Sequence, residues 1–157
     1  MLATLTDRRF SDPGWVFEPK LDGERCLAFR KGLQVRLLSR NRKRLNDHYS
    51  GLAVALAAQE ADDFVVDGEV VAFERGRSSF ARLQRRMQLG DPEAARRSGV
   101  AVYLYLFDVV HVHGHDVTRL GLRQRRPCCG ACWGSGTPAV HAPPQRRQRG
   151  LLAGGLP

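Results

Sequence analysis

One lysine of this chain stands where a side-chain amine could act as a nucleophile. Lys20 follows the apolar, strand-like residues 15–17 and precedes the dipeptide Asp22-Gly23. An amine becomes nucleophilic only after it loses its proton, which desolvation or a nearby cation such as Arg25 favours. The spacing predicts a lysine at the edge of a sheet beside a tight bend, available for covalent catalysis. The alternative is a plain β-hairpin that turns at Asp22-Gly23 and leaves the lysine exposed.

A carboxylate between two apolar segments forms a second candidate site. Residues 64–73 are apolar on both sides of Asp67, Gly68 and Glu69. A carboxylate between buried strand segments is unfavourable unless a partner compensates its charge. Ribose hydroxyls or a Mg²⁺ ion could do so. The alternative is a strand-turn-strand hairpin at Asp67-Gly68.

Two further stretches lie within or directly after predicted strands. Residues 103–110 have the composition of a buried strand and include Phe107, which could stack on a planar ring or simply belong to the core. The run Ser39-Arg40-Asn41-Arg42 follows the strand at 35–38, so that Arg40 could reach a phosphate. A solvated loop is the alternative, and we expect it for residues 42–44.

In this order, the four stretches resemble the motifs of the lysine nucleotidyltransferases, which are the DNA ligases, RNA ligases and mRNA-capping enzymes. Residues 1–5, 12–15 and 79–86 also look like bacterial ATP-dependent DNA ligases, more narrowly like the adenylation domain associated with end-joining repair. The resemblance covers residues 1–126. It implies an α+β nucleotidyltransferase fold, with antiparallel sheets and flanking helices, that this chain contains only in part.

The resemblance also implies a mechanism and the residues that carry it. Lys20 would attack the α-phosphate of ATP and hold AMP as a phosphoramidate, with Mg²⁺ (or Mn²⁺) neutralising the departing pyrophosphate. The AMP would then pass to a nick in double-stranded DNA, with end-joining repair proteins as possible partners. The remaining roles implied are adenine contacts by Glu18 and Phe107, a nucleotide contact by Leu21, ribose or metal contacts by Arg25 and Glu69, and a DNA phosphate contact by Arg40. We expect Asp22 to shape the turn and orient Lys20, and Asp67 and Asp108 to be structural.

The elements that must position these residues follow from hydrophobic periodicity. Strands are expected at 15–19, 25–30, 34–38, 64–73 and 101–112, with turns at Lys31-Gly32 and at 113–115. Helices are expected at 47–60, capped by Asn46 or Asp47, at 79–88, capped by Ser78 or Ser79, and after Asp91-Pro92.

Composition narrows the class of protein. A chain of 157 residues can form one domain with a core. It has no apolar run of ~18 residues for a membrane span and no secretory leader. Four cysteines without secretory context indicate a reducing compartment. The resemblance to bacterial DNA ligases implies a cytoplasmic location close to the nucleoid. The formal net charge of +9 does not by itself indicate DNA binding, because most of it lies in residues 117–157, which hold seven arginines and no acid.

Residues 127–157 differ from everything before them. They are rich in Arg, Gly, Pro and Cys without helical or strand period, which predicts an irregular or disordered tail. Zinc binding by Cys129 and Cys132 with Cys128 or His141 is one interpretation, and a basic arm for DNA is another. We favour a third, an out-of-frame translation of downstream ligase sequence.

Activity of the chain is expected to be weak or absent. The family's later lysine-containing motifs and its OB-fold domain have no counterpart in the sequence, so charge stabilisation at phosphorus would be incomplete. Two alternatives remain open: an RNA ligase or capping-type nucleotidyltransferase, and a non-catalytic nucleic-acid-binding remnant.

Overall fold

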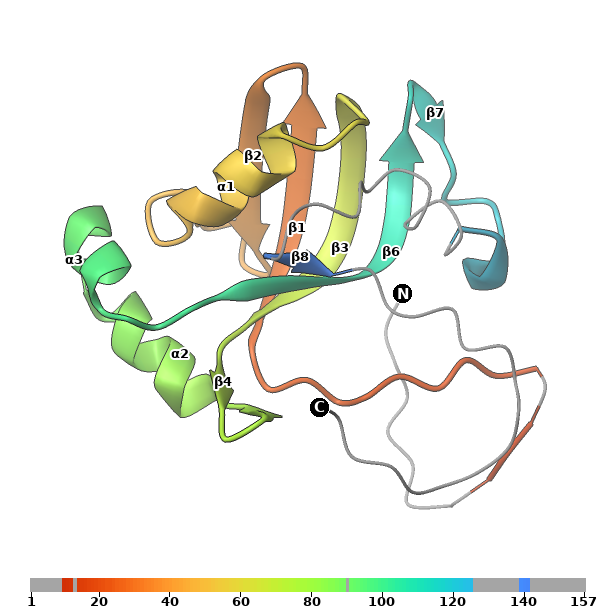
Figure 1. The fold of residues 1–157 in the computed structure, drawn as a ribbon. Helices are drawn as coiled ribbons and strands as arrows, with labels where there is room; N and C mark the ends of the chain where they lie inside the picture. The colour runs from red at the N-terminus through yellow and green to blue at the C-terminus, as the bar shows by residue number, and fades with distance from the viewer. Residues whose placement is uncertain (1–9, 13, 90, 126–138, 142–157) are drawn as a thin grey trace.

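A computed structural model describes residues 10–12, 14–89, 91–125 and 139–141. Its centre is a twisted sheet with helix α1 (Ser50–Ala57) across one face and α2 (Phe80–Met87) and α3 (Pro92–Arg97) gathered at one end (Figure 1). The strands, in spatial order, are β2 (Gln34–Ser39), β1 (Glu24–Lys31), β3 (Asp63–Val71), β6 (Tyr103–Val112) and β7 (His115–Asp116), all antiparallel to their neighbours. A small separate sheet pairs β4 (Phe73–Glu74) with β5 (Arg77–Ser78). The predicted α+β class is confirmed.

The predicted hairpin of the first two strands is confirmed to within about a residue. β1 and β2 pair from Cys26 with Ser39 to Lys31 with Gln34. Gly32 in the turn has a φ of 58°, a conformation that glycine adopts without a steric penalty. The turn expected at 113–115 is also found between β6 and β7.

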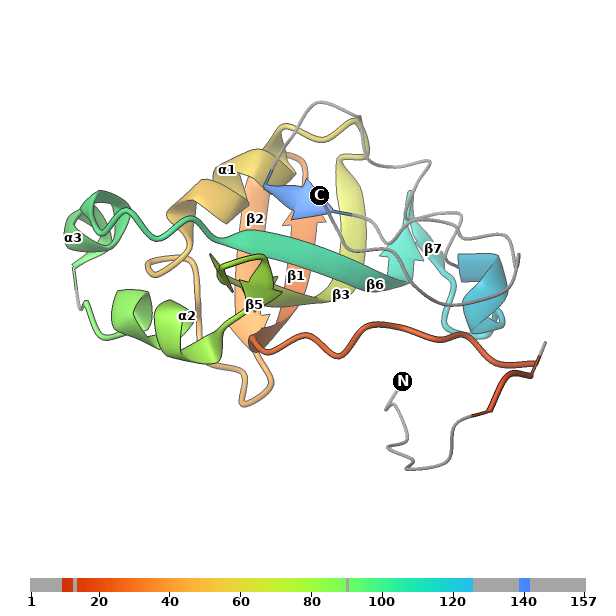
Figure 2. The same cartoon turned by 60° about the horizontal axis from the view of Figure 1, so that its bottom comes forward.

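The strand expected at 15–19 is wrong. The segment runs extended beneath the sheet without joining it (Figure 2). Trp15 and Phe17 remain 53% and 56% exposed, so the apolar pattern there does not mark a buried face. Pro19 also has no N–H to give to a ladder.

Helix α1 begins three residues later than expected, after Tyr49, and ends at Ala57. Asn46 does not cap it: its side chain accepts a hydrogen bond from the backbone N–H of Leu37 and donates to the carbonyl of Val35, along the outer edge of β2. The Asn46 side chain therefore hydrogen-bonds to the sheet, and the predicted cap of the helix by Asn46 is wrong.

The cap of α2 is as predicted, and α3 begins after Asp91 with proline in its first turn, as expected. Ser79 caps α2 by accepting from the N–H of Arg82. Asp91 caps α3 with Pro92 in the first turn.

Strand β3 passes straight through Asp67-Gly68, so the hairpin alternative at that dipeptide is wrong. Gly68 is needed for a different reason: a Cβ there would lie 2.5 Å from the carbonyl oxygen of Tyr105 on β6. Gly23 is similar, with a Cβ position 2.2 Å from the carbonyl oxygen of Val70, and β1 begins directly after it without a hairpin. Both Asp-Gly pairs therefore mark close backbone approach.

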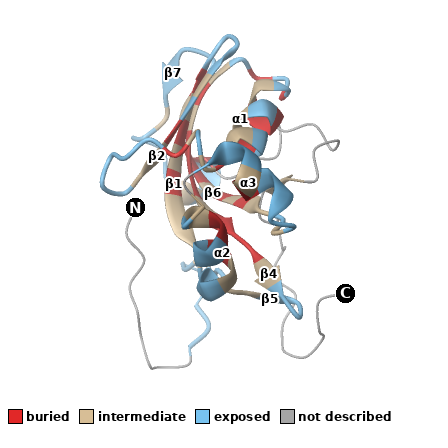
Figure 3. Ribbon diagram, turned by 90° about the vertical axis from the view of Figure 1, so that its left-hand side faces the viewer, coloured by how far each residue is buried: buried red, intermediate tan, exposed pale blue. Residues whose placement is uncertain are grey.

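The hydrophobic core lies between the sheet and α1 (Figure 3). Fully or almost fully buried members include Cys26, Leu52, Leu56, Phe64, Val66, Leu104 and Leu106. On β1 these are the even-numbered residues, because successive side chains of a strand point to opposite faces. The odd-numbered residues, beginning with Arg25, face the other way.

A buried arginine links α2 to α3 and to the segments that precede α1 and β6. Arg86 of α2 is 6% exposed and donates to the carbonyls of Ala95, Val100 and His48. Burial lowers the pKa of this guanidinium from its usual value.

Of the tail, the structure describes only residues 139–141. Val140–His141 forms β8, parallel to β6, and the N–H of Leu104 donates to the carbonyl of Ala139 at 2.8 Å. The ring of His141 stacks on Tyr105 with centroids 4.9 Å apart. The candidate zinc ligands Cys128, Cys129 and Cys132 lie outside the described residues, as does most of the predicted irregular tail.

Within the described ranges, no helix combines the length and the apolar composition that a bilayer span needs.

Candidate active site

A cavity of about 190 Å³ opens where the N-terminal segment passes the start of β1, the C-terminal part of β3 and the middle of β6. Five of the residues predicted to bind nucleotide line it together. The full lining is Glu18, Pro19, Leu21, Arg25, Glu69, Phe107, Asp108 and Leu122. Three adjacent strands supply the polar and aromatic part, since Arg25 pairs with Glu69 across β1 and β3, and Phe107 lies on β6 beside them.

Arg25 is fixed within this cavity by a buried carboxylate. Its Nε and Nη2 atoms donate to the two carboxylate oxygens of Asp67 at 3.0 and 2.5 Å, a bidentate pair. Its guanidinium carbon lies 5.7 Å from the centroid of the Phe107 ring, so that cation and ring form one wall. The hydrogen bond to Asp67 raises the pKa of Arg25 further above its usual value. Asp67 is thus a positioning group for the arginine.

Glu69 is a half-buried carboxylate on the neighbouring strand. Burial raises its pKa above the usual value of 4.5, and the nearby charge of Arg25 opposes that rise. Removal of its hydration favours any ligand that can donate hydrogen bonds or positive charge to it. Glu69 therefore has the chemistry expected of a partner for ribose hydroxyls or a cation.

Lys20 lies at the rim of the cavity. Its side chain is exposed, and its neighbours Pro19 and Leu21 line the cavity although Lys20 does not. The amine is therefore not desolvated by this fold. Asp22 holds the segment in place: its N–H donates to the Ser78 hydroxyl, and its carboxylate accepts from the N–H of Phe80, both at 3.0 Å. The orienting role expected of Asp22 is consistent with this anchorage, and the nucleophilic role of Lys20 stays a prediction.

Arg40 is not part of the cavity. It is exposed in a tight loop after β2, in which the Ser39 hydroxyl accepts from the N–H of Lys43 at 3.2 Å. Its DNA contact also stays a prediction.

Sequence reasoning missed the ion pair that builds the back wall. Asp108, 3% exposed, accepts two hydrogen bonds of 2.7 Å from Arg125, which also donates to the carbonyl of Thr118 at 3.4 Å. An acid at the end of an apolar strand needs a cation, but nothing in the sequence pattern shows that Arg125 supplies it. Pro19 and Leu122 were missed as well, because apolar lining residues resemble ordinary core.

Whether the cavity could hold a divalent cation depends on the side-chain donors that line it. The described residues contain no cluster of three or more His, Cys, Asp or Glu side chains that could hold a metal alone. Mg²⁺ is commonly bound by one or two carboxylates together with substrate phosphates and water. Of the cavity carboxylates, Glu69 fits that mode of binding.

Comparison with known proteins supports the resemblance to ATP-dependent DNA ligases. The family model described as an ATP dependent DNA ligase domain matches residues 1–133. DNA ligase C2 of Mycolicibacterium smegmatis is 29% identical over 136 residues, which cover 84% of this chain and 38% of that protein. The end-joining protein LigD of Pseudomonas aeruginosa is 33% identical over 113 residues, covering 71% of this chain and 13% of that protein.

Solved structures agree with the sequence matches. The ligase domain of LigD from M. tuberculosis superimposes with a TM-score of 0.58 and 26% identity, covering 73% of this chain and 35% of that domain. A mycobacterial DNA ligase D solved with ATP gives a TM-score of 0.57 at 25% identity. The chain thus spans well under half the length of these relatives. All of these proteins are DNA ligases, which favours the DNA-ligase prediction over RNA ligases and capping enzymes. The chain belongs to the ATP-dependent DNA ligase domain family, a family of nucleotidyltransferases.

Proposed function

We propose that this chain carries the nucleotide site of an ATP-dependent DNA ligase and that Lys20 is its nucleophile. The observation that carries the proposal is the convergence of Glu18, Leu21, Arg25, Glu69 and Phe107 on one cavity beside Lys20. These residues come from three separate stretches of the sequence, and three of them lie on adjacent strands. A fold without a nucleotide to bind has no reason to gather them.

In the proposed reaction the Lys20 amine attacks the α-phosphorus of ATP. A P–N bond forms, the P–O bond to pyrophosphate breaks, and the amine proton passes to solvent. A 5′-phosphate at a nick in double-stranded DNA then displaces the lysine and takes the AMP. The 3′-hydroxyl then attacks that 5′-phosphate. A phosphodiester bond forms, AMP leaves, and the nick is sealed.

The side chains of the cavity would hold the nucleotide. Phe107 and the guanidinium of Arg25 offer a flat wall for adenine, which Glu18 would contact at its edge. Glu69 would accept from a ribose hydroxyl, and with the phosphates it would hold a Mg²⁺ or Mn²⁺ ion, which neutralises charge on the departing pyrophosphate. Arg40 would contact a phosphate of the nicked strand.

We also propose that the chain alone forms the adduct slowly. Among the cavity residues the structure describes, three are acidic and only Arg25 is cationic, and it is already paired with Asp67. Stabilisation of the charge that develops on the phosphates would be incomplete, and each missing contact typically costs ~10²–10³ in rate. The end-joining role named for the Pseudomonas relative is the biological context we propose.

Labelled ATP tests the nucleophile. The chain has three lysines, Lys20, Lys31 and Lys43, so that peptide mapping can assign a covalent label without ambiguity. We expect a low yield of AMP adduct on Lys20, abolished in Lys20→Ala and retained in the control Lys43→Ala. Label that persists in Lys20→Ala, or that maps to another lysine, would contradict the proposal. A high yield from the wild-type chain would show that the cavity needs no further cations.

A further inference from the structure

A second, larger hollow of about 960 Å³ lies on the same face of the sheet as the nucleotide cavity, at the other end of the strands. We call it the distal groove. The residues that define it here are Phe29, Lys31, Arg36, Arg44, Asp63 and His111. On β1, Arg25 of the cavity and Phe29 and Lys31 of the groove are all odd-numbered and so share one face. The β1–β3 register is unbroken from Glu24 to Lys31, so the same holds for Glu69 and Asp63 on β3.

Three exposed cations converge on the groove from different places in the sequence. Lys31 comes from the end of β1, Arg36 from β2, and Arg44 from the loop that follows β2. In the part of the chain that the structure describes, none of the three forms an ion pair within 4 Å. Their charge is therefore available to a ligand.

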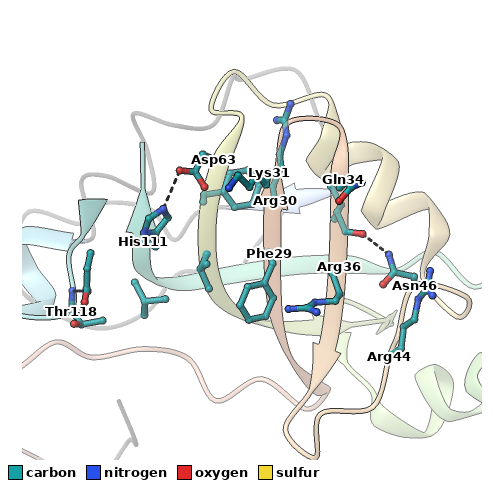
Figure 4. A pocket seen from close by; sticks show the side chains of 15 residues that line it. Phe29, Arg30, Lys31, Gln34, Arg36, Arg44, Asn46, Asp63, His111 and Thr118 are labelled. Atoms are coloured by element: carbon teal, nitrogen blue, oxygen red, sulfur yellow. Dashed lines mark hydrogen bonds and ion pairs between the residues drawn. The ribbon is translucent and has the colours of Figure 1, made fainter. Parts of the chain in front are cut away.

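The two acids of the groove are already engaged. The Asp63 carboxylate accepts from the N–H of Gly114 at 2.9 Å and lies 3.0 Å from Nε2 of His111. Asp116 accepts from both the N–H and the hydroxyl of Thr118. Asp63 and His111 lie toward one side of the groove with Lys31 beside Asp63, and Arg36 and Arg44 lie toward the other side (Figure 4). The groove presents a positive surface to an anion that lies along it.

The floor of the groove is apolar and its frame is rigid. The guanidinium carbon of Arg36 lies 5.0 Å from the centroid of the Phe29 ring, so that the cation lies over the ring on this face of the sheet. The backbone near Arg44 is fixed, because Leu38 and Arg44 form an isolated bridge and Asn46 is hydrogen-bonded to β2. A cation–aromatic floor beside spaced cations suits a sugar–phosphate chain, which has both apolar and anionic surfaces.

We propose that the distal groove binds the phosphodiester backbone of one DNA strand as it leads away from the nucleotide cavity. This rests on the proposed ligase function and identifies a second surface that engages its substrate. Arg25 and Phe29 lie four positions apart on β1, about 13 Å of strand. At about 3.4 Å of rise per nucleotide, about four nucleotides of a DNA strand that runs along β1 cover this distance.

Salt dependence of DNA binding tests the groove. Anisotropy of a labelled, nicked duplex is measured with the full chain between about 50 and 200 mM salt. The variant Arg36→Gln/Arg44→Gln is compared with Arg75→Gln/Arg85→Gln, which removes two exposed arginines outside the groove. We expect the groove pair to reduce the slope of log K against log salt by about 1.8, as two lost phosphate contacts require, and the control pair to leave it unchanged. Equal slopes in the two double variants overturn the proposal.

Two further measurements separate the possible failures. Labelling of Lys20 by ATP is measured in the same proteins and is expected to be unchanged in the groove pair. A groove-dependent slope without any Lys20 adduct in wild type would contradict the ligase mechanism and leave the groove assignment standing. Binding to phosphatidylserine vesicles is the second measurement. Groove-dependent vesicle binding with unaltered DNA binding would overturn the assignment to DNA. Thermal melting of both double variants confirms that each is folded, as expected for exposed positions.

Discussion

Glu69 concentrates the electrostatic conflict of the nucleotide cavity in one side chain. It is half-buried near two further acids, Asp67 and Glu24, and its charge is offset by Arg25 and by a hydrogen bond from the backbone of Gly23. A ligand that donates to this carboxylate removes an unfavourable interaction as well as forming a new one. The charge of Glu69 therefore destabilises the unliganded protein and stabilises its complex with such a ligand.

We expect Glu69→Gln to weaken ATP binding by about tenfold while it stabilises the unliganded protein at pH 7. Because the folded pKa of Glu69 is raised above 4.5, the folded state holds this proton more tightly than the unfolded state. Wild-type stability should therefore rise relative to Glu69→Gln as the pH falls through the raised pKa towards 4.5. Urea unfolding of both proteins across that range, with ATP titrations at pH 7, measures the two effects. A stability difference that is constant with pH would contradict the assignment.

Strands β3 and β6 owe their close contact to a position without a side chain. Gly68 faces the backbone of Tyr105, and the pairing of β3 with β6 shifts register next to it, between Asp67 and Gly68. The register shift is therefore next to Glu69 on β3 and opposite the part of β6 that carries Phe107. The local geometry of this pair of strands thus sets how far the carboxylate stands from the aromatic ring.

We expect Gly68→Ala to reduce the free energy of unfolding by about 1–3 kcal/mol, because a backbone oxygen at 2.5 Å cannot move aside as a flexible side chain would. The matched control is Gly51→Ala in α1, where an added Cβ meets nothing within 4 Å. This change should leave stability unchanged or raise it by up to about 1 kcal/mol. Chemical denaturation measures both. Equal effects at the two glycines would mean that the β3–β6 contact relaxes freely.

Buried arginines link elements of the molecule in addition to its apolar core. Arg30 donates to the carbonyls of Leu56, Gln59 and Ala61 at the end of α1, which fixes the helix to β1. Arg86 performs the corresponding task for α2 and α3. A chain with 22 arginines therefore uses part of its positive charge as internal cross-links, which is a further reason not to equate basic composition with DNA binding.

Neighbouring arginines of α2 provide the test at this scale. Arg86→Ala leaves several buried carbonyls without their donor, and we expect a loss of about 3 kcal/mol in the free energy of unfolding. Arg85→Ala, one residue earlier and exposed, should change it by less than about 0.5 kcal/mol. Thermal and urea unfolding distinguish the two. Similar losses at both positions would indicate that helix propensity, rather than the buried hydrogen bonds, dominates.

Sequence alone predicted the parts of this molecule that chemistry constrains most. The residue types at Arg25, Glu69 and Phe107 are few and ordered, and the structure brings them to one cavity. Helix α2 was placed within about a residue because its cap, Ser79, is local information. The predictions failed where packing decides: the apolar run at 15–17 lies outside the sheet, and nothing local pairs Asp108 with Arg125.

Asn46 has a consequence for how copies of this protein meet. Its amide takes the hydrogen-bonding places that a further strand would use on β2, and the N–H of Leu45 donates to the carbonyl of Leu37 on the same side. An uncovered outer strand is a template for intermolecular assembly. Asn46, which a short loop places beside β2, occupies this edge, and we expect it to disfavour edge-to-edge aggregation although no helix covers the strand.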